Sequence, residues 1–222
     1  MGDPERKTAL YDAFARTGKA LSNGKRLELL DLLAQGERTV DALAKAAALN
    51  LTTASAHLQT LKAAGLVATR RDGVRIHYRL AGDDVAALYA LLRNVAQAHQ
   101  DAVEPARTAY LGTDHAEEVS REDLITRSRS GEIVVLDVRP AEEYAAGHIP
   151  GALSIPVAEL ADRITELPAD AEVVAYCRGA YCVMAYDAVR LLHDHSRKAV
   201  RLTDGMLEWR LAELPVDTES AA

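Results

Sequence analysis

The fold of the C-terminal half of this 222-residue chain is indicated most clearly by one stretch of sequence, Val173-Val174-Ala175-Tyr176-Cys177-Arg178-Gly179-Ala180-Tyr181-Cys182. An apolar run that ends on a cysteine, passes through a short loop with a glycine and enters a helical pattern is typical of an α/β domain. The N–H groups of such a loop and the N-terminus of the following helix favour thiolate over thiol, and Arg178 adds a positive charge beside the sulfur. The sequence therefore predicts a reactive thiol at Cys177, with two buried and inert cysteines as the alternative.

The charge of the chain is divided unevenly between its two halves. Residues 1–80 carry 13 Lys and Arg against 8 Asp and Glu, although the whole chain has a formal net charge of −7. A basic N-terminal half suits a polyanionic partner, whereas an acidic C-terminal half repels one. We therefore expect two domains with different tasks, and 222 residues suffice for two separate cores.

Cysteine usage and hydropathy indicate the compartment. The sequence contains no run of about 18 apolar residues and no N-terminal export pattern, so we expect a cytoplasmic protein that does not bind a membrane. Two cysteines spaced i and i+5 in a reducing compartment are more typical of reactive than of structural thiols. We expect no cofactor and no resident metal.

The N-terminal half combines helical and hairpin patterns. Apolar residues recur at helical spacing over 9–21, 27–33, 40–49 and 54–61, and two β-rich stretches then flank Asp72-Gly73, a strong hairpin signal. Helices followed by a basic hairpin predict a mainly α winged helix-turn-helix. Residues 39–47 are expected to support the helix 52–64 in the DNA major groove, with the hairpin 70–75 beside it.

The expected DNA-contacting residues are short polar or basic side chains on the second helix and the hairpin. A solvated helix face beside an unrelated basic hairpin is the alternative. Polar groups that could reach base edges or phosphates are Thr52, Thr53, Ser55, His57 and Gln59, and basic groups that could neutralise phosphates are Lys62, Arg70, Arg71 and Arg75.

The segment TTASAHLQTLKAAGLV at 52–67, followed by a hairpin that ends Tyr78-Arg79-Leu80, resembles the ArsR family of winged-helix repressors over about residues 8–100. The resemblance implies a homodimer that pairs through 9–21 and 84–100 and reads an inverted repeat in double-stranded operator DNA. Many relatives sense metals through cysteines on the supporting helix, but residues 39–44 contain none. A metal site with Asp84, His99 or Asp101 is the weaker alternative to surface residues on the last helix.

The C-terminal half alternates strand and helix patterns, which predicts an α/β domain with a largely parallel sheet. Strands are expected at 132–138, 151–155, 172–177 and 198–202, with helices at 120–130, 157–167 and 183–193. Cys177 then lies at the carboxyl end of a strand, where such sheets place their sites. Pro105 and Gly112 interrupt the helical pattern between the halves, so we expect domains at 1–104 and 117–222 joined by a linker at 105–116.

Four motifs in order resemble a single rhodanese domain over about residues 117–216: LDVR at 136–139, EYAAGHIPGA at 143–152, VAYCRG at 174–179 and TDGMLEW at 203–209. The resemblance implies that Cys177 accepts sulfur and that the loop of Arg178, Gly179, Ala180, Tyr181 and Cys182 cradles the terminal sulfur through backbone N–H groups. Asp137, Arg139, His148 and Trp209 are expected to brace the fold. Phosphatase and arsenate-reductase relatives carry an oxyanion-clamping arginine where this chain has Val183, so a sulfane sulfur suits the short loop better than a phosphate.

Cys182 departs from the rhodanese pattern, which more often has a small hydroxyl or aliphatic residue there. A persulfide on Cys177 could be attacked by the Cys182 thiol, which releases hydrosulfide and leaves a disulfide, or it could close a polysulfide bridge. Bridging needs Cα atoms within about 7 Å. A small apolar residue that ends the loop is an equally good interpretation of Cys182.

These patterns together predict a DNA-binding transcriptional repressor whose rhodanese domain senses persulfide or polysulfide through Cys177, with Cys182 taking part. A sulfane sulfur donor is its expected small-molecule partner. The alternative is a thiosulfate or persulfide sulfurtransferase tethered to a DNA-binding domain, and a third interpretation is an inert dimerisation module. The operator, the donor and the sign of the effect on DNA binding stay open at this point.

Overall fold

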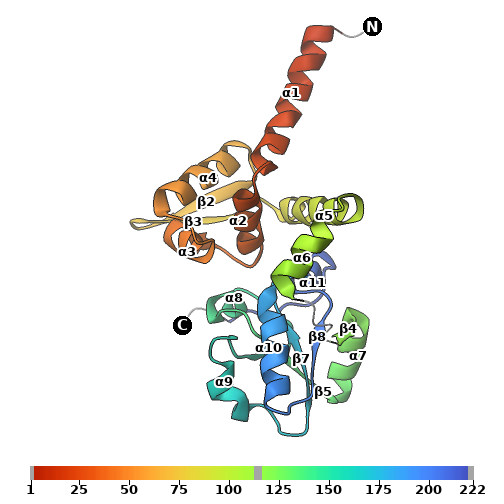
Figure 1. Cartoon of the computed structure of the whole chain (residues 1–222). Coiled ribbons are helices and arrows are strands. Elements are labelled where there is room, and N and C mark those ends of the chain that lie inside the picture. The colour runs from red at the N-terminus through yellow and green to blue at the C-terminus, as the bar shows by residue number, and fades with distance from the viewer. Residues whose placement is uncertain (1–2, 113–116, 220–222) are drawn as a thin grey trace. The chain divides into compact units, whose positions relative to one another are not determined.

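The computed structural model describes residues 3–112 and 117–219, which divide into two compact units, Met1–Leu92 and Arg93–Ala222 (Figure 1). Helix α5 (Asp83–His99) begins in the first unit and ends in the second, so one continuous helix belongs to both. The two units are described separately.

The first unit is a helical domain with a small antiparallel sheet. The side chains of Asn23, Thr39 and Asn50 accept hydrogen bonds from the first backbone N–H groups of α2, α3 and α4, and so cap these helices. Strand β1 pairs with β3, which pairs with β2. Before α5, its elements are α1 (Pro4–Leu21), α2 (Gly24–Ala34), β1 (Arg38–Thr39), α3 (Val40–Ala46), α4 (Leu51–Ala63), β2 (Val67–Asp72) and β3 (Arg75–Leu80).

The predicted winged helix-turn-helix is confirmed. Helices α3 and α4 follow each other closely, and Leu43, Leu58 and Leu61 bury their side chains in the core beneath them. Strands β2 and β3 form the wing, in which Asp72 pairs with Arg75 across a two-residue turn. Gly73 begins this turn with φ 58°, a left-handed conformation that favours glycine.

The second unit is an α/β domain, as predicted. Within residues 117–219, five strands form a parallel sheet in the order β4-β8-β7-β5-β6. Its elements are α6 (Val103–Leu111), β4 (Glu118–Val119), α7 (Arg121–Ser130), β5 (Ile133–Asp137), α8 (Ala141–Ala145), β6 (Leu153–Ser154), α9 (Leu160–Arg163), a 3₁₀ turn (Ile164–Glu166), β7 (Glu172–Tyr176), α10 (Val183–Asp194), β8 (Ala199–Leu202) and α11 (Met206–Leu211).

Helices cover both faces of this sheet (Figure 1). Helices α9 and α10 pack on one face, where Leu192 contacts the cluster that contains Val173. Helices α7 and α11 pack on the other face, where Trp209 joins the cluster that contains Val174. Neighbouring residues of β7 thus alternate between two cores, which is the pattern of a strand buried on both sides.

The part of the expected linker 105–116 that the structure describes is mostly helical, so Pro105 does not interrupt the helix as expected. Residues 103–111 form α6, and Pro105 is the third residue of this helix. The first-turn N–H groups of a helix have no intrahelical partner, so a proline there costs no hydrogen bond. Gly112, with φ 91°, follows the helix, and the predicted linker residues 113–116 lie outside the described residues.

A helix can cross a membrane only if it is long enough and apolar enough. Over residues 3–112 and 117–219, no helix is both long enough and apolar enough to cross a bilayer.

Candidate functional site

The two cysteines lie together at the carboxyl end of the central strand β7. Cys177 follows this strand and is 1% exposed, and Cys182 is the residue immediately before α10. The structure joins them in a disulfide with Cα atoms 6.0 Å apart, inside the range that bridging needs. The loop between them closes on itself, because the Cys182 N–H donates to the Gly179 carbonyl at 3.1 Å. This loop of residues 177–182 is called the sulfur loop below.

Helix α11 holds the backbone of the sulfur loop in place. The N–H groups of Met206 and Leu207 donate to the carbonyls of Cys177 and Arg178, each at 2.9 Å. The first N–H groups of a helix need partners outside it, and the loop carbonyls supply them. Gly205 makes this approach possible, because a Cβ there would lie 2.3 Å from the nitrogen of Gly179 and 2.6 Å from the Cys177 carbonyl oxygen.

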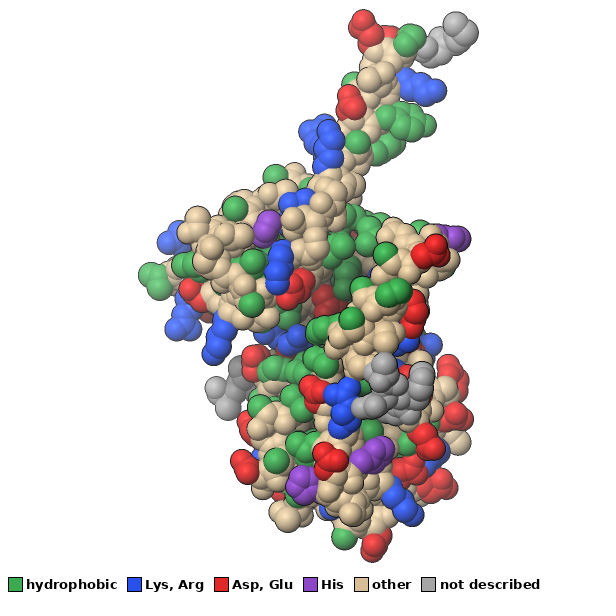
Figure 2. Space-filling view, in the orientation of Figure 1, with side chains coloured by type: hydrophobic (Ala, Val, Ile, Leu, Met, Phe, Trp, Pro, Cys, Tyr) green, Lys and Arg blue, Asp and Glu red, His purple; other side chains and the backbone are tan. Residues whose placement is uncertain are grey.

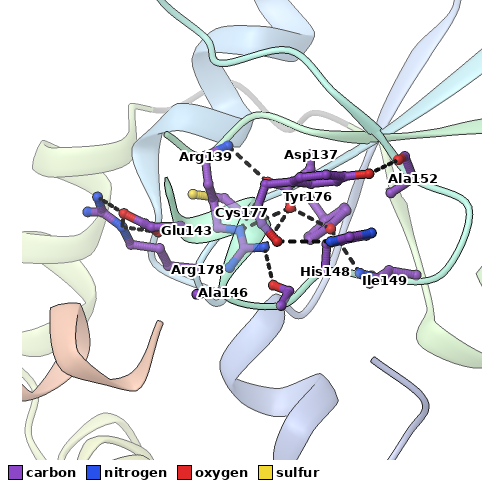
Figure 3. A network of polar contacts seen from close by, with 12 residues as sticks. Asp137, Arg139, Glu143, Ala146, His148, Ile149, Ala152, Tyr176, Cys177 and Arg178 are labelled. Carbon is purple, nitrogen blue, oxygen red and sulfur yellow. Dashed lines mark hydrogen bonds and ion pairs between the residues drawn. The ribbon is translucent and has the colours of Figure 1, made fainter. Parts of the chain in front are cut away.

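Arg178, which the sequence predicts as a positive charge beside Cys177, forms an ion pair with Glu143. The Arg178 guanidinium donates to both oxygens of Glu143, with its Nη2 2.6 Å from Oε1 and its Nε 3.0 Å from Oε2 (Figure 3). The Glu143 side chain is only 1% exposed, so Arg178 compensates a buried negative charge.

A buried network braces the strand ends beneath the sulfur loop (Figure 3). Asp137 and Arg139 are both fully buried and form an ion pair, with Nη2 2.6 Å from Oδ2. The Tyr176 hydroxyl donates to the same Oδ2 at 2.6 Å and accepts from the Ile149 N–H at 3.1 Å. Burial, reinforced by the Asp137 charge, raises the pKa of Tyr176, which keeps its hydroxyl a donor. Because Tyr176 precedes Cys177, this network positions the start of the loop.

His148 and Trp209, which are also expected to brace the fold, both contact other residues of the domain. The His148 ring stacks on the Tyr144 ring with centroids 3.6 Å apart, and its Nδ1 lies 2.9 Å from the Tyr144 carbonyl oxygen. The Trp209 indole N–H donates to the Pro215 carbonyl at 2.8 Å. Both side chains therefore bind structural partners.

The predicted DNA-contacting residues occupy α4 and the wing. Figure 2 shows Lys and Arg side chains gathered about the wing of the first unit, whereas acidic side chains are frequent on the second. Residues predicted to contact DNA and lying on α4 are Thr52, Thr53, Ser55, His57, Gln59 and Lys62, and those on the wing are Arg70, Arg71 and Arg75.

Four of these side chains have partners within the protein, and one of them is Arg71, whose Nε donates to the Gly73 carbonyl at 3.0 Å. The Gln59 amide donates to the Tyr78 hydroxyl at 2.9 Å, and the Lys62 ammonium donates to the Thr69 hydroxyl at 2.8 Å. Arg70 forms an ion pair with Glu37, which raises the pKa of the arginine chiefly through their hydrogen bond. Gln59 and Lys62 thus tie α4 to the wing and fix its orientation.

Comparison with known proteins identifies both halves. Residues 23–69 match the bacterial regulatory protein, arsR family, and residues 120–212 match the rhodanese-like domain. Over 216 residues the chain is 59% identical to the HTH-type transcriptional regulator Rv0324 of Mycobacterium tuberculosis, a match that covers 97% of this chain and 95% of that protein. The chain belongs to the ArsR family of transcriptional regulators and carries a rhodanese-like domain. It is a DNA-binding transcriptional regulator.

Further relatives match one half of the regulator. A sulfurtransferase of Allochromatium vinosum is 34% identical over 103 residues, which is 45% of the regulator and 92% of that protein. The homodimeric winged helix-turn-helix DNA-binding domain (fragment 1–100) of Mb0332 from Mycobacterium bovis, solved by NMR, is 59% identical. That match covers 46% of the regulator and 94% of the fragment, with a TM-score of 0.42.

The sequence did not predict that three charged residues, Glu143, Glu208 and Arg93, lie at the sulfur loop of the regulator. Glu143 and Glu208 stand within the quoted rhodanese motifs, but only the structure pairs Glu143 with Arg178 and Glu208 with Arg93. Arg93 lies 115 residues from Glu208 in the sequence, and no local pattern signals such a contact.

We predict that Asp137→Asn lowers the free energy of unfolding of the regulator by about 3–5 kcal/mol, because it removes the carboxylate that forms an ion pair with the buried Arg139. Urea titration monitored by fluorescence of Trp209, the single tryptophan, measures this loss. Arg163→Gln is the control, since Arg163 pairs with Glu159 and Glu166 at the surface, where the loss of an ion pair costs about 1 kcal/mol or less. Equal losses in the two variants would contradict a bracing role for the Asp137–Arg139 pair.

Proposed function

We propose that the regulator is a repressor whose affinity for operator DNA changes with the sulfur state of Cys177. The observation that carries this proposal is the pairing of Cys177 with Cys182 in one loop, between the end of β7 and the start of α10. The match to a rhodanese-like domain supports sulfur as the reacting element. Because Cys177 is buried, a compact donor such as inorganic polysulfide fits it best.

Two balanced steps connect the donor to the disulfide. In the first, the Cys177 thiolate attacks a terminal sulfur of the polysulfide, forms a persulfide and releases a polysulfide shorter by one sulfur. In the second, the Cys182 sulfur attacks the Cys177 sulfur and the bond from Cys177 to the outer sulfur breaks. The outer sulfur takes the Cys182 proton and leaves as hydrosulfide. The two cysteine sulfurs are thereby oxidised to a disulfide, and the sulfane sulfur is reduced to sulfide. The loop of Arg178, Gly179, Ala180 and Tyr181 cradles the terminal sulfur between these steps.

The DNA-binding half acts as a homodimer that reads an inverted repeat in double-stranded DNA. Apolar side chains on two helices support the dimer: α1 exposes Leu10, Tyr11 and Phe14, and α5 exposes Leu88, Leu91 and Val95. Exposed apolar faces of this kind mark interaction surfaces. In the dimer, two copies of α4 enter successive major grooves. As a DNA-binding protein the regulator acts in the cytoplasm.

We predict that inorganic polysulfide adds one sulfur to the reduced protein, or removes two hydrogens from it, and changes its DNA affinity in the same samples. Intact mass and fluorescence anisotropy report the two effects, with a duplex selected by the protein from a random-sequence pool. Cys177→Ser should abolish both effects, whereas Cys182→Ser should stop the reaction at the persulfide.

A DNA response to polysulfide that survives in Cys177→Ser would overturn the proposal. Sulfur loading without any change in DNA affinity would favour the alternative, a sulfurtransferase tethered to a DNA-binding domain. The similarity to the Allochromatium vinosum sulfurtransferase supports this alternative. Steady-state turnover of thiosulfate with cyanide as acceptor tests that enzyme directly.

We predict that Arg75→Gln weakens binding about equally for all duplex sequences and lowers the slope of log affinity against log salt by about 1, the loss of one phosphate contact. Arg75 is exposed at the start of β3, so the substitution leaves the core intact. Salt titrations of the wild type, Arg75→Gln and Arg163→Gln, a substitution in the rhodanese-like domain, measure the slopes. An unchanged slope in Arg75→Gln would remove this arginine from the DNA interface.

We predict that Leu91→Glu makes the protein monomeric and weakens DNA binding, because it places a charge on the exposed apolar face of α5. Light scattering after size-exclusion chromatography measures the mass of each variant. Val74→Glu, at the 94% exposed tip of the wing, is the control and should leave the mass unchanged. A dimeric Leu91→Glu protein would place the interface elsewhere.

A further inference from the structure

The last turns of α5 contact the sulfur loop and the helix that supports it. Arg93 forms an ion pair with Glu208 of α11, and the two side chains are 15% and 16% exposed. The same guanidinium lies over the Tyr181 ring, 4.9 Å from its centroid. The Tyr181 hydroxyl donates to the amide oxygen of Gln97, one helical turn after Arg93. All four residues belong to the compact unit Arg93–Ala222.

The Arg93–Glu208 ion pair packs directly on the loop backbone. A Cβ on Gly179 would lie 3.2 Å from one Glu208 oxygen and 3.4 Å from the Arg93 Nη1. The other function of Glu208 is to cap α11, because its Oε2 accepts from the Gly205 N–H at 3.0 Å. Since α11 also donates to the loop carbonyls, a shift of the loop backbone displaces Glu208 and hence Arg93.

Tyr181 provides a second route from the loop to α5. It directly precedes Cys182, so any movement of Cys182 toward or away from Cys177 moves Tyr181 as well. A persulfide extends from Cys177 by an S–S bond of about 2 Å and occupies the space that Cys182 fills in the disulfide. Burial raises the pKa of Tyr181, so its hydroxyl stays protonated and remains a donor to Gln97.

We propose that Arg93 and Gln97 are positioning residues that couple the sulfur state of the loop to α5, and through this helix to the DNA-binding unit. The proposal rests on the function proposed above and assigns the residues that carry the regulation. Arg93 responds to Glu208 and Tyr181, and Gln97 responds to Tyr181. Because α5 runs without a break from Asp83 to His99, a displacement of its last turns reaches the unit in which it begins.

The test compares DNA affinity before and after inorganic polysulfide in variants of these contacts, with intact mass recorded on the same samples. The wild type should change its affinity for the selected duplex about 5- to 150-fold, the usual range of allosteric coupling. Arg93→Gln should respond about twofold or less while Cys177 still gains sulfur and the reduced protein still binds the duplex. Arg93→Lys should recover part of the response, because lysine keeps the charge but not the planar fork. Arg163→Gln should behave as the wild type.

A double-mutant cycle isolates the second contact. Gln97→Ala and Tyr181→Phe each remove one side of a single hydrogen bond, and Gln97 is exposed on a helix, so neither substitution threatens folding. Each should weaken the polysulfide response, and the double variant should weaken it no further than either alone. These two variants carry the test if Arg93→Gln fails to fold, which Trp209 fluorescence reveals.

The outcomes separate this inference from the proposed function. Full responses in Arg93→Gln, Gln97→Ala and Tyr181→Phe would overturn the coupling role of α5 and leave the sulfur-responsive regulator standing. An unresponsive wild type with sulfur loaded on Cys177 would overturn both. A lost response in Arg93→Gln together with lost sulfur loading would make Arg93 a residue of the loading step and would contradict the coupling role.

Discussion

The sulfur loop and helix α11 touch through their backbones at Gly205, and the arrangement of the candidate site depends on that contact. With no side chain at Gly205, the Cys177 and Arg178 carbonyls can accept the first two N–H groups of α11. The residue that precedes the loop is fixed as well, because Asp137 and the Ile149 N–H hold the buried Tyr176 hydroxyl. Because Cys177 is held both by α11 and through Tyr176, a change in its covalent state is passed on to residues 178–182 and to the first turn of α11 that binds them.

Charge is distributed unevenly between the two units. The basic wing and α4 suit DNA, and the acidic second unit has no attraction for it. Within that unit, the positive charges nearest the loop are paired: Arg178 with Glu143, Arg93 with Glu208 and Arg139 with Asp137. Arginines paired in this way do not form the bidentate oxyanion clamp with which related loops bind phosphate or arsenate, in agreement with the absence of an arginine at position 183.

The sequence was informative wherever the signal was local. The run 173–177, the loop glycine and the helical pattern after Cys182 predicted β7, the sulfur loop and α10, and the Asp72-Gly73 pair predicted the wing. Short or unusual elements were not predicted. Strand β4 has only two residues. Helix α6 contains Pro105, which it tolerates because the first turn of a helix needs no N–H at that position. The partners of Arg178 and Arg93 were not predicted either, since both ion pairs join segments distant in the sequence and arise only when the sheet and α5 are assembled.

We propose that the sulfur state of Cys177 changes the affinity for DNA. Such coupling is reciprocal, so DNA must change the stability of the disulfide by the same free energy. The most direct measurement is the thiol–disulfide equilibrium of Cys177 and Cys182 in glutathione buffers, with and without a saturating amount of the selected duplex. The duplex should shift the midpoint potential in proportion to the change in duplex affinity that the disulfide causes, by about 30 mV for each tenfold change in affinity. A midpoint that stays the same with and without DNA would contradict this coupling.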